Sequence, residues 1–349
     1  MFNLSMGNQQ YSLVRHLIFI AFLCLTQSCK KPGDAKTAFY YWKSSFNLNK
    51  QQNQLIKETS CNMLYTRFFD ITWDDQLQGA YPNAIIDFTQ PPGELNITPV
   101  IFITNKTFEN IPNNLVDSMA INSNLLINRI AKKNNITYKT IQIDCDWTLN
   151  TREKYFNFLI RLKKVSNRHV EATIRLHQIK YKERTGVPPV DKGVLMFYNM
   201  GKLNSGLQQP SSIYNEADAE KYVAWIRHYP LPLDVALPLF SWAVHIREGR
   251  IIQLYNNLGK TQLSNPVNFT QLGNVFRAKK SFFLNGVYIK ENDIFKLEQM
   301  DVKTLKKAAE QLSTNLSQQK NRTIIYYELG SLNLSEFKAE TLNEVSAAF

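Results

Sequence analysis

The stretch Tyr138–Trp147, YKTIQIDCDW, decides how the fold of this chain is interpreted. Two sets of side chains alternate in it, apolar Ile141, Ile143 and Cys145 and polar Gln142, Asp144 and Asp146. A period of two is typical of a β-strand whose two faces meet different surroundings. The pattern therefore predicts a strand that ends with two carboxylates on the same face.

A helix is predicted directly after this strand. Asn150 offers an N-cap, and Glu153 follows three residues later, a spacing that forms a capping box. An apolar stripe at helical spacing continues from there: Tyr155, Phe158, Leu159 and Leu162. The chain thus contains a strand–helix unit.

Seven other segments have strand patterns, and most are separated by helical patterns or long connections. They are Ala38–Trp42, Met63–Asp70, Thr98–Thr104, Val170–His177, Val194–Met200, Leu233–Phe240 and Thr323–Leu329. Helices after the second and fifth strands look missing or degenerate. Alternating strands and helices pair in parallel through right-handed crossovers, and eight strands close a ring. We predict an α/β fold, a TIM-like (β/α)8 barrel over residues 38–349. An open doubly wound sheet is the alternative, but no glycine-rich phosphate loop follows any strand.

An insertion of about residues 243–300 follows the seventh strand. Arg250–Tyr255 and Ser281–Lys290 have strand patterns, and Asn285-Gly286 is a strong hairpin signal. We expect a β-hairpin insertion that forms part of a cleft wall, because connections after barrel strands lie on the catalytic face.

The N-terminal segment predicts export and lipidation. Nine apolar residues, Leu17–Leu25, follow Arg15 and are too few to span a bilayer. Ser28-Cys29 then resembles the looser lipoprotein signals of Bacteroidetes-type bacteria. We expect a signal peptide over residues 1–28, acylation (palmitate) at Cys29 and a tether over residues 29–37, placing the protein in the cell envelope, periplasmic or surface-facing. An ordinary secretory signal is the alternative.

Charge and cysteines limit the partners and cofactors. The 349 residues include 41 Lys and Arg against 29 Asp and Glu, a net charge of +12. An acidic partner would suit this balance, but no basic run exceeds a pair and no aromatic–basic motif appears, so we expect no nucleic acid. Beyond the signal only Cys61 and Cys145 remain. Without CxxC or His/Cys spacing, we expect no metal and no cofactor.

Polar and aromatic residues gather where the predicted strands end, the face on which barrel enzymes place their chemistry. Asp144 and Asp146 have Cα atoms roughly 6.5–7 Å apart, so their carboxyls could serve as acid and base or nucleophile in glycoside cleavage. Glu328 is a third catalytic candidate. Candidate substrate-binding residues are Arg67, Arg175, His177, Tyr198, Asn199, Trp147 and Trp242. The structural alternative is that Arg175 or His177 neutralises an aspartate in a polar cluster.

Four blocks carry a family resemblance: QIDCDWT, TIRLHQ, LMFYNMG and LDVALPLFSW. Together they resemble a group of uncharacterised bacterial lipoproteins, which in turn resemble glycoside-hydrolase-like (β/α)8 barrels. The Asp144-x-Asp146 pair is also similar to the fourth-strand acidic motif of chitinase-like enzymes. In those enzymes a catalytic glutamate follows two residues on, and here Thr148 stands in its place. This departure argues against a chitinase-type, substrate-assisted mechanism.

Two functions follow from these observations. The first is an envelope-anchored glycoside-hydrolase-like barrel that processes a cell-surface or dietary polysaccharide. The second is a non-catalytic carbohydrate-binding or assembly lipoprotein, which the threonine at position 148 favours. A metal-dependent hydrolase is a weaker third hypothesis, because no ligand cluster can be assembled from the sequence.

Overall fold

The computed structural model describes residues 35–256, 258–331 and 333–349. The predicted signal peptide, Cys29 and nearly all of the tether lie outside the described residues. None of the helices within the described ranges combines the length and apolar character needed to cross a membrane.

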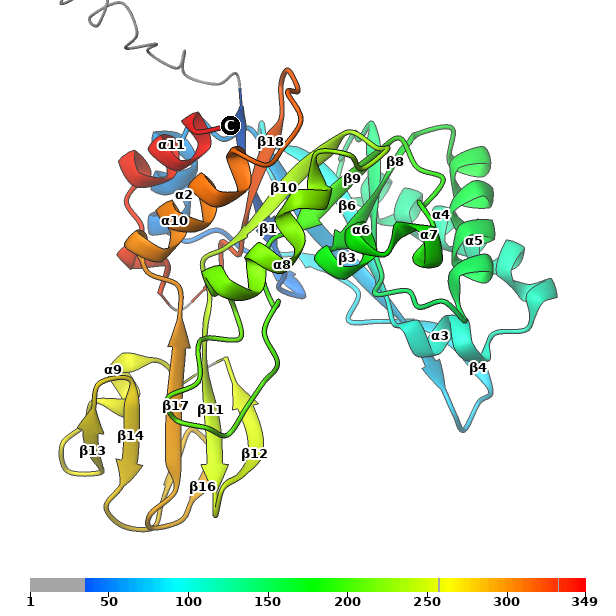
Figure 1. The fold of residues 1–349 in the computed structure, drawn as a ribbon. Helices are drawn as coiled ribbons and strands as arrows, with labels where there is room; N and C mark the ends of the chain where they lie inside the picture. Colours follow the sequence, from blue (N-terminus) through cyan, green and yellow to red (C-terminus); the bar gives the residue numbers. More distant parts are fainter. Residues whose placement is uncertain (1–34, 257, 332) are drawn as a thin grey trace, which may run out of the picture. The chain divides into compact units, whose positions relative to one another are not determined.

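Eight parallel strands form a closed ring (Figure 1). They are β1 (Lys36–Tyr41), β3 (Met63–Asp74), β6 (Asn96–Ile103), β7 (Thr140–Asp144), β8 (His169–Arg175), β9 (Lys192–Met196), β10 (Leu233–Pro238) and β18 (Thr323–Tyr327). Each strand pairs with its neighbour in chain order, and β1 pairs with both β3 and β18. This double pairing closes the barrel, so the predicted (β/α)8 fold is confirmed and the open sheet is excluded.

Helices connect most of the strands. They are α2 (Lys50–Glu58), α3 (Asn105–Asn110), α4 (Val116–Lys133), α5 (Arg152–Ser166), α6 (Leu176–Lys180), α7 (Lys182–Thr185), α8 (Glu216–Ile226), α10 (Val302–Ser313) and α11 (Ala339–Ala347). The two degenerate connections occur as predicted. After β3 the chain forms β4 (Gly79–Asn83), which pairs antiparallel with the end of β3, and the two-residue β5 (Asp87–Phe88). After β8 it forms only the short α6 and α7.

Some predicted ends were wrong. The fifth strand stops at Arg175 rather than His177, because the Arg175 backbone N–H donates to the Gln178 side chain and begins α6. Helix α5 follows Thr151, not Asn150; the Thr151 hydroxyl accepts a hydrogen bond from the Thr148 backbone and bonds the Asn105 side chain. Local hydrogen bonds between side chains and backbone N–H groups therefore moved both boundaries.

The insertion after β10 is larger than the predicted hairpin. It is an antiparallel sheet in the order β12-β11-β17-β14-β13, with a hairpin, β15–β16, that turns at Asn285-Gly286 (Figure 1). The bounds are β11 (Ser241–Arg247), β12 (Arg250–Tyr255), β13 (Phe269–Leu272), β14 (Val275–Ala278), β15 (Phe282–Leu284), β16 (Val287–Ile289) and β17 (Ile294–Gln299), with the short helix α9 (Lys260–Leu263). Its own buried cluster includes Phe269, Phe276 and Phe295. The insertion thus has a core of its own.

Apolar side chains pack on both sides of the barrel wall. The larger core lies between strands and helices, and a smaller cluster, including Tyr40, Tyr65 and Met196, fills the ring. This division follows from the period-two alternation of each strand. Cys145 lies in the outer core, and both it and Cys61 are buried free thiols. Burial raises the pKa of Cys61 to about 11, so it behaves as an apolar side chain.

Candidate functional site

An ion pair stands at the carboxyl ends of β7 and β8. Arg175 donates to Asp146 through two nitrogens, with Nε–Oδ1 at 2.6 Å and Nη2–Oδ2 at 3.0 Å. The Asp146 side chain is about half exposed, at 52%. A two-point guanidinium–carboxylate contact fixes the orientation of both groups. Asp146 is therefore held in place at the rim of the barrel.

Asp144 lies deeper in the barrel than Asp146. It is buried, and Thr173 Oγ1 donates to its Oδ1 at 2.6 Å. Burial raises the pKa of Asp144 to about 6, against the opposing effects of the Arg175 charge and the Thr173 hydrogen bond. The two aspartates share a strand face but have different environments, because one faces solvent and the other the ring interior.

A pocket of about 460 Å³ opens beside the ion pair, and its lining includes Asp146, Arg175, His177, Tyr198 and Asn199. His177 lies in the first turn of α6, and burial lowers its pKa, so it is neutral at pH 7. The Tyr198 ring lies 6.0 Å from the Arg175 guanidinium, and its buried hydroxyl has no hydrogen-bond partner in the described part of the chain. The structure thus brings six predicted site residues to the lining of one pocket, because Trp147 borders it as well.

A row of aromatic rings lies next to the pocket; we call it the aromatic row. It consists of Trp42, Tyr327, Tyr198, Phe240 and Trp242, with successive ring centroids 5.5, 5.6, 5.7 and 5.2 Å apart. All but Tyr198 are partly exposed. The rings come from the ends of β1, β18, β9 and β10 and the start of β11, so the closure of the barrel assembles them.

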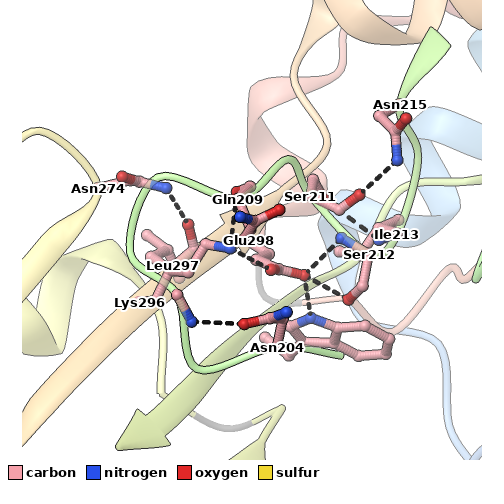
Figure 2. Close-up of polar contacts among 12 residues, drawn as sticks. Asn204, Gln209, Ser211, Ser212, Ile213, Asn215, Asn274, Lys296, Leu297 and Glu298 are labelled. Atoms are coloured by element: carbon pink, nitrogen blue, oxygen red, sulfur yellow. Dashed lines mark hydrogen bonds and ion pairs between the residues drawn. The ribbon is translucent and has the colours of Figure 1, made fainter. Parts of the chain in front are cut away.

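A buried carboxylate fixes one end of this row (Figure 2). Glu298 on β17 accepts hydrogen bonds from the Trp242 indole at 3.0 Å and from the Ser212 backbone and hydroxyl at 2.9 and 2.5 Å. Lys296 lies 3.0 Å from the other carboxylate oxygen and donates to the Gln209 carbonyl. Burial opposes ionisation, but these hydrogen bonds hold the pKa of Glu298 below its usual value. The insertion is thereby joined to the loop of residues 199–215.

Four predicted residues make other contacts. Trp147 borders the pocket, but its ring is 1% exposed, stacks on Tyr155 and donates to the Thr185 carbonyl, so the indole is packed in the core. Arg67 is held by Asp70 at 2.6 Å and by the Trp42 carbonyl.

Glu328 and Trp242 lie outside the lining of the 460 Å³ pocket. Glu328 is largely buried, which raises its pKa, and one of its carboxylate oxygens has no hydrogen-bond partner among the described residues. Trp242 belongs instead to the aromatic row, where Glu298 holds its indole. Both residues stay near the carboxyl ends of the strands without facing the ion pair.

Sequence reasoning missed three contributors to this face, Tyr327, Phe240 and Glu298. Tyr327 had a signal, since in TIIYYEL it alternates with residues that face the helices. Phe240 closes a predicted strand and could have been included with the strand ends. Glu298 had no local signal, because Ser212 and Trp242, which donate hydrogen bonds to it, are more than fifty residues away in the chain.

The described residues hold no cluster of three or more His, Cys, Asp or Glu that could bind a metal. What this face offers chemically is a group of aromatic rings whose planes are inclined by 26° to 81° to their neighbours, an ion pair and a neutral imidazole. Thr148, where chitinase-like enzymes have glutamate, is exposed and borders the pocket.

Comparison with known proteins agrees with the barrel. No family model and no curated protein sequence matches the chain. Among solved structures, the spore cortex-lytic enzyme SleL of Bacillus cereus is similar at 15% identity and a TM-score of 0.53, over 91% of this chain and 75% of that one. SleL of Bacillus megaterium QM B1551 is similar at 13% identity and a TM-score of 0.53, over 92% of this chain and 75% of that one. A GH18 chitinase from Cycas revoluta, solved with (GlcNAc)4, is similar at 11% identity and a TM-score of 0.50, over 90% of this chain and 99% of that one. These neighbours are glycoside-hydrolase-like TIM barrels, and at such identities the likeness shows the fold alone.

Proposed function

We propose that this protein is an envelope-anchored lipoprotein whose barrel binds a polysaccharide at the carboxyl ends of its strands without cleaving it. The observation that carries the proposal is the aromatic row beside an aspartate that is already ion-paired. A glycoside-hydrolase-like barrel supports a glycan as the ligand class.

Binding is supported by the shape and chemistry of the aromatic row. The partly exposed rings of Trp42, Tyr327, Phe240 and Trp242 provide apolar surface on which the C–H faces of sugar rings can pack. Polar side chains at the neighbouring pocket, His177 and Asn199, would orient hydroxyl or amide groups. Because the Cycas chitinase was solved with (GlcNAc)4, we propose a glycan that contains N-acetylglucosamine.

Cleavage is disfavoured by the ion pairing and burial of the acidic groups at this face. Glycosidases usually need two carboxyl groups that flank the scissile bond. Asp146 is tied to Arg175, Asp144 is buried under it, and residue 148 is threonine. No carboxyl among the described lining residues of the pocket is therefore free to donate a proton and also reach a substrate.

Hydrolysis is the second candidate, and one observation favours it. A pKa of about 6 keeps part of Asp144 protonated near neutral pH, which suits a general acid. Asp146 would then serve as base or nucleophile once substrate displaced Arg175.

Calorimetric titration with (GlcNAc)4, together with chromatography of the sugar after long incubation, tests the proposal. We expect saturable binding with no shorter product. Trp42→Ala and Trp242→Ala should each weaken binding about ten-fold, which corresponds to about 1.4 kcal/mol. Trp225→Ala is the matched control, because this exposed tryptophan on α8 lies outside the aromatic row. Product release that Asp144→Asn abolishes would establish hydrolysis instead, and no binding to any N-acetylglucosamine glycan would refute both functions.

The lipid anchor is proposed from the sequence. Six residues separate Cys29 from β1, a reach of at most about 22 Å. Labelling cells with radioactive palmitate should mark the wild type and Cys24→Ala but not Cys29→Ala. Label that persists in Cys29→Ala would refute acylation at this residue.

A further inference from the structure

A second and larger pocket opens at the amino end of the barrel. It measures about 670 Å³, within the range of small-molecule sites. Its lining combines the first residues of several barrel strands with the end of α4. Charged and polar side chains in this lining include Tyr65, Glu171, Lys192, Lys132, Lys139 and Arg168. In a TIM barrel this end normally serves stability, so an open pocket here needs an explanation.

Glu171 on β8 is a buried acid in this lining. It is 6% exposed, and its Oε2 has no hydrogen-bond partner among the described residues. Burial and the neighbouring Asp234 raise its pKa to about 7, against the attraction of Lys192 and hydrogen bonding from Tyr65 and Gln142. A buried acceptor without a partner costs about 1–3 kcal/mol, which a ligand with a hydroxyl donor would recover.

Asp234, the other acid inside this end of the ring, is satisfied by the protein. It accepts from Lys192 at 2.8 Å, from the Thr323 backbone at 2.9 Å and from Gln319 at 3.3 Å. The two acids therefore differ: the protein satisfies Asp234 with three hydrogen bonds, whereas Glu171 lines the pocket with one oxygen, Oε2, that has no hydrogen-bond partner among the described residues.

Three cations border the mouth of the pocket. Lys132, Lys139 and Arg168 are exposed, and within the described ranges none of them lies within ion-pair distance of an acid. Arg168 lies over the Tyr138 ring at 5.2 Å, which holds its guanidinium at the rim. Unpaired cations around a concave opening attract anions.

We propose that this pocket is a second ligand site, which takes a small polyhydroxylated anion. A hydroxyl of the ligand would donate to Glu171 in the interior, and its carboxylate or phosphate would meet Lys132, Lys139 and Arg168 at the mouth. Threonine hydroxyls along the lining, at positions 98, 137, 140 and 323, complete the polar surface. This site stands apart from the aromatic row and does not depend on the proposed function.

Calorimetric titration of the full-length protein with glucuronate and with glucose 6-phosphate tests the site. We expect saturable binding of at least one of them, and the two separate a sugar acid from a sugar phosphate as the source of the anion. Glucose, which lacks the anionic group, and inorganic phosphate, which lacks the sugar hydroxyls, should each bind at least ten-fold more weakly. If neither sugar anion saturates the protein, or if inorganic phosphate binds equally well, the proposal is wrong.

Variants locate the site. Lys132→Ala and Arg168→Ala should each weaken binding several-fold, whereas Lys133→Ala should not, because this neighbouring exposed lysine does not line the pocket. Glu171→Gln keeps the shape of the side chain and should weaken binding about ten-fold. Equal effects of Lys132→Ala and Lys133→Ala would mean that general charge, not this pocket, attracts the anion. Titration of each variant with (GlcNAc)4 should match the wild type, which separates this test from that of the proposed function.

Discussion

Replacing Asp144 by Asn is expected to stabilise the protein at pH 8 more than at pH 4.5. The native state raises the pKa of this carboxyl from 3.8 to about 6, mainly by burial. Between these two values the folded chain binds more protons than the unfolded chain. The favourable contribution of the bound proton is complete below pH 4 and is lost as the pH rises through 6.

The magnitude follows from the size of the shift. About two pKa units correspond to about 3 kcal/mol of unfolding free energy, which the wild type has lost by pH 8. At pH 4.5 only about 1 kcal/mol has been lost, so the advantage of the Asn variant should grow by about 2 kcal/mol between the two conditions. Asn can still accept the Thr173 hydrogen bond, and any fixed cost of the buried amide cancels in this difference.

Urea unfolding of both proteins at pH 4.5 and 8 measures the effect. Asp117→Asn is the matched control, because its side chain is 64% exposed and the change should stay within about 0.5 kcal/mol at both pH values. An advantage of the Asp144→Asn variant that stays constant or shrinks toward pH 8 would refute the reasoning. It would mean that the folded protein stabilises the carboxylate rather than the acid.

Three further predictions concern other parts of the fold. Thr148→Glu adds an exposed carboxyl beside Asp146 and should allow slow (GlcNAc)4 cleavage, which product chromatography would detect; no product would mean that this glutamate is not the missing component. Glu298→Gln leaves Lys296 buried without its counter-charge and should cost about 3 kcal/mol in urea unfolding. Asp301→Ala removes the N-cap of α10 and should cost about 1 kcal/mol in the same assay, and an unchanged midpoint would contradict the capping role.

Much of the barrel could be predicted because its signals are local. Local strand patterns marked all eight strands, and local caps at Asn215 and Asp301 begin α8 and α10. The Asn285-Gly286 turn forms where expected. Each of these depends on residues a few positions apart, which a single sequence displays.

What could not be predicted depends on distant partners. Strand β4 contains Gly79 and Pro82 and looks like a loop, and it forms only because β3 continues to Asp74 and offers it an edge. The different burial of Asp144 and Asp146 could not be predicted from the alternation either, because β7 ends at Asp144 and Asp146 lies beyond the strand at the rim. The burial of Trp147 could not be predicted for a similar reason, because the turn between β7 and α5 directs its ring into the core.

The two ends of the barrel present different chemical groups to a ligand. At the carboxyl end, Arg67 and Arg175 pair with Asp70 and Asp146, and partly exposed aromatic rings lie beside them, which suits a neutral glycan. At the amino end, one oxygen of Glu171 has no hydrogen-bond partner among the described residues and three cations line the same pocket, which suits a charged ligand with hydroxyls. Because the packed ring interior, with Tyr40 and Met196 buried between them, separates these environments, each can bind its ligand without altering the charge of the other.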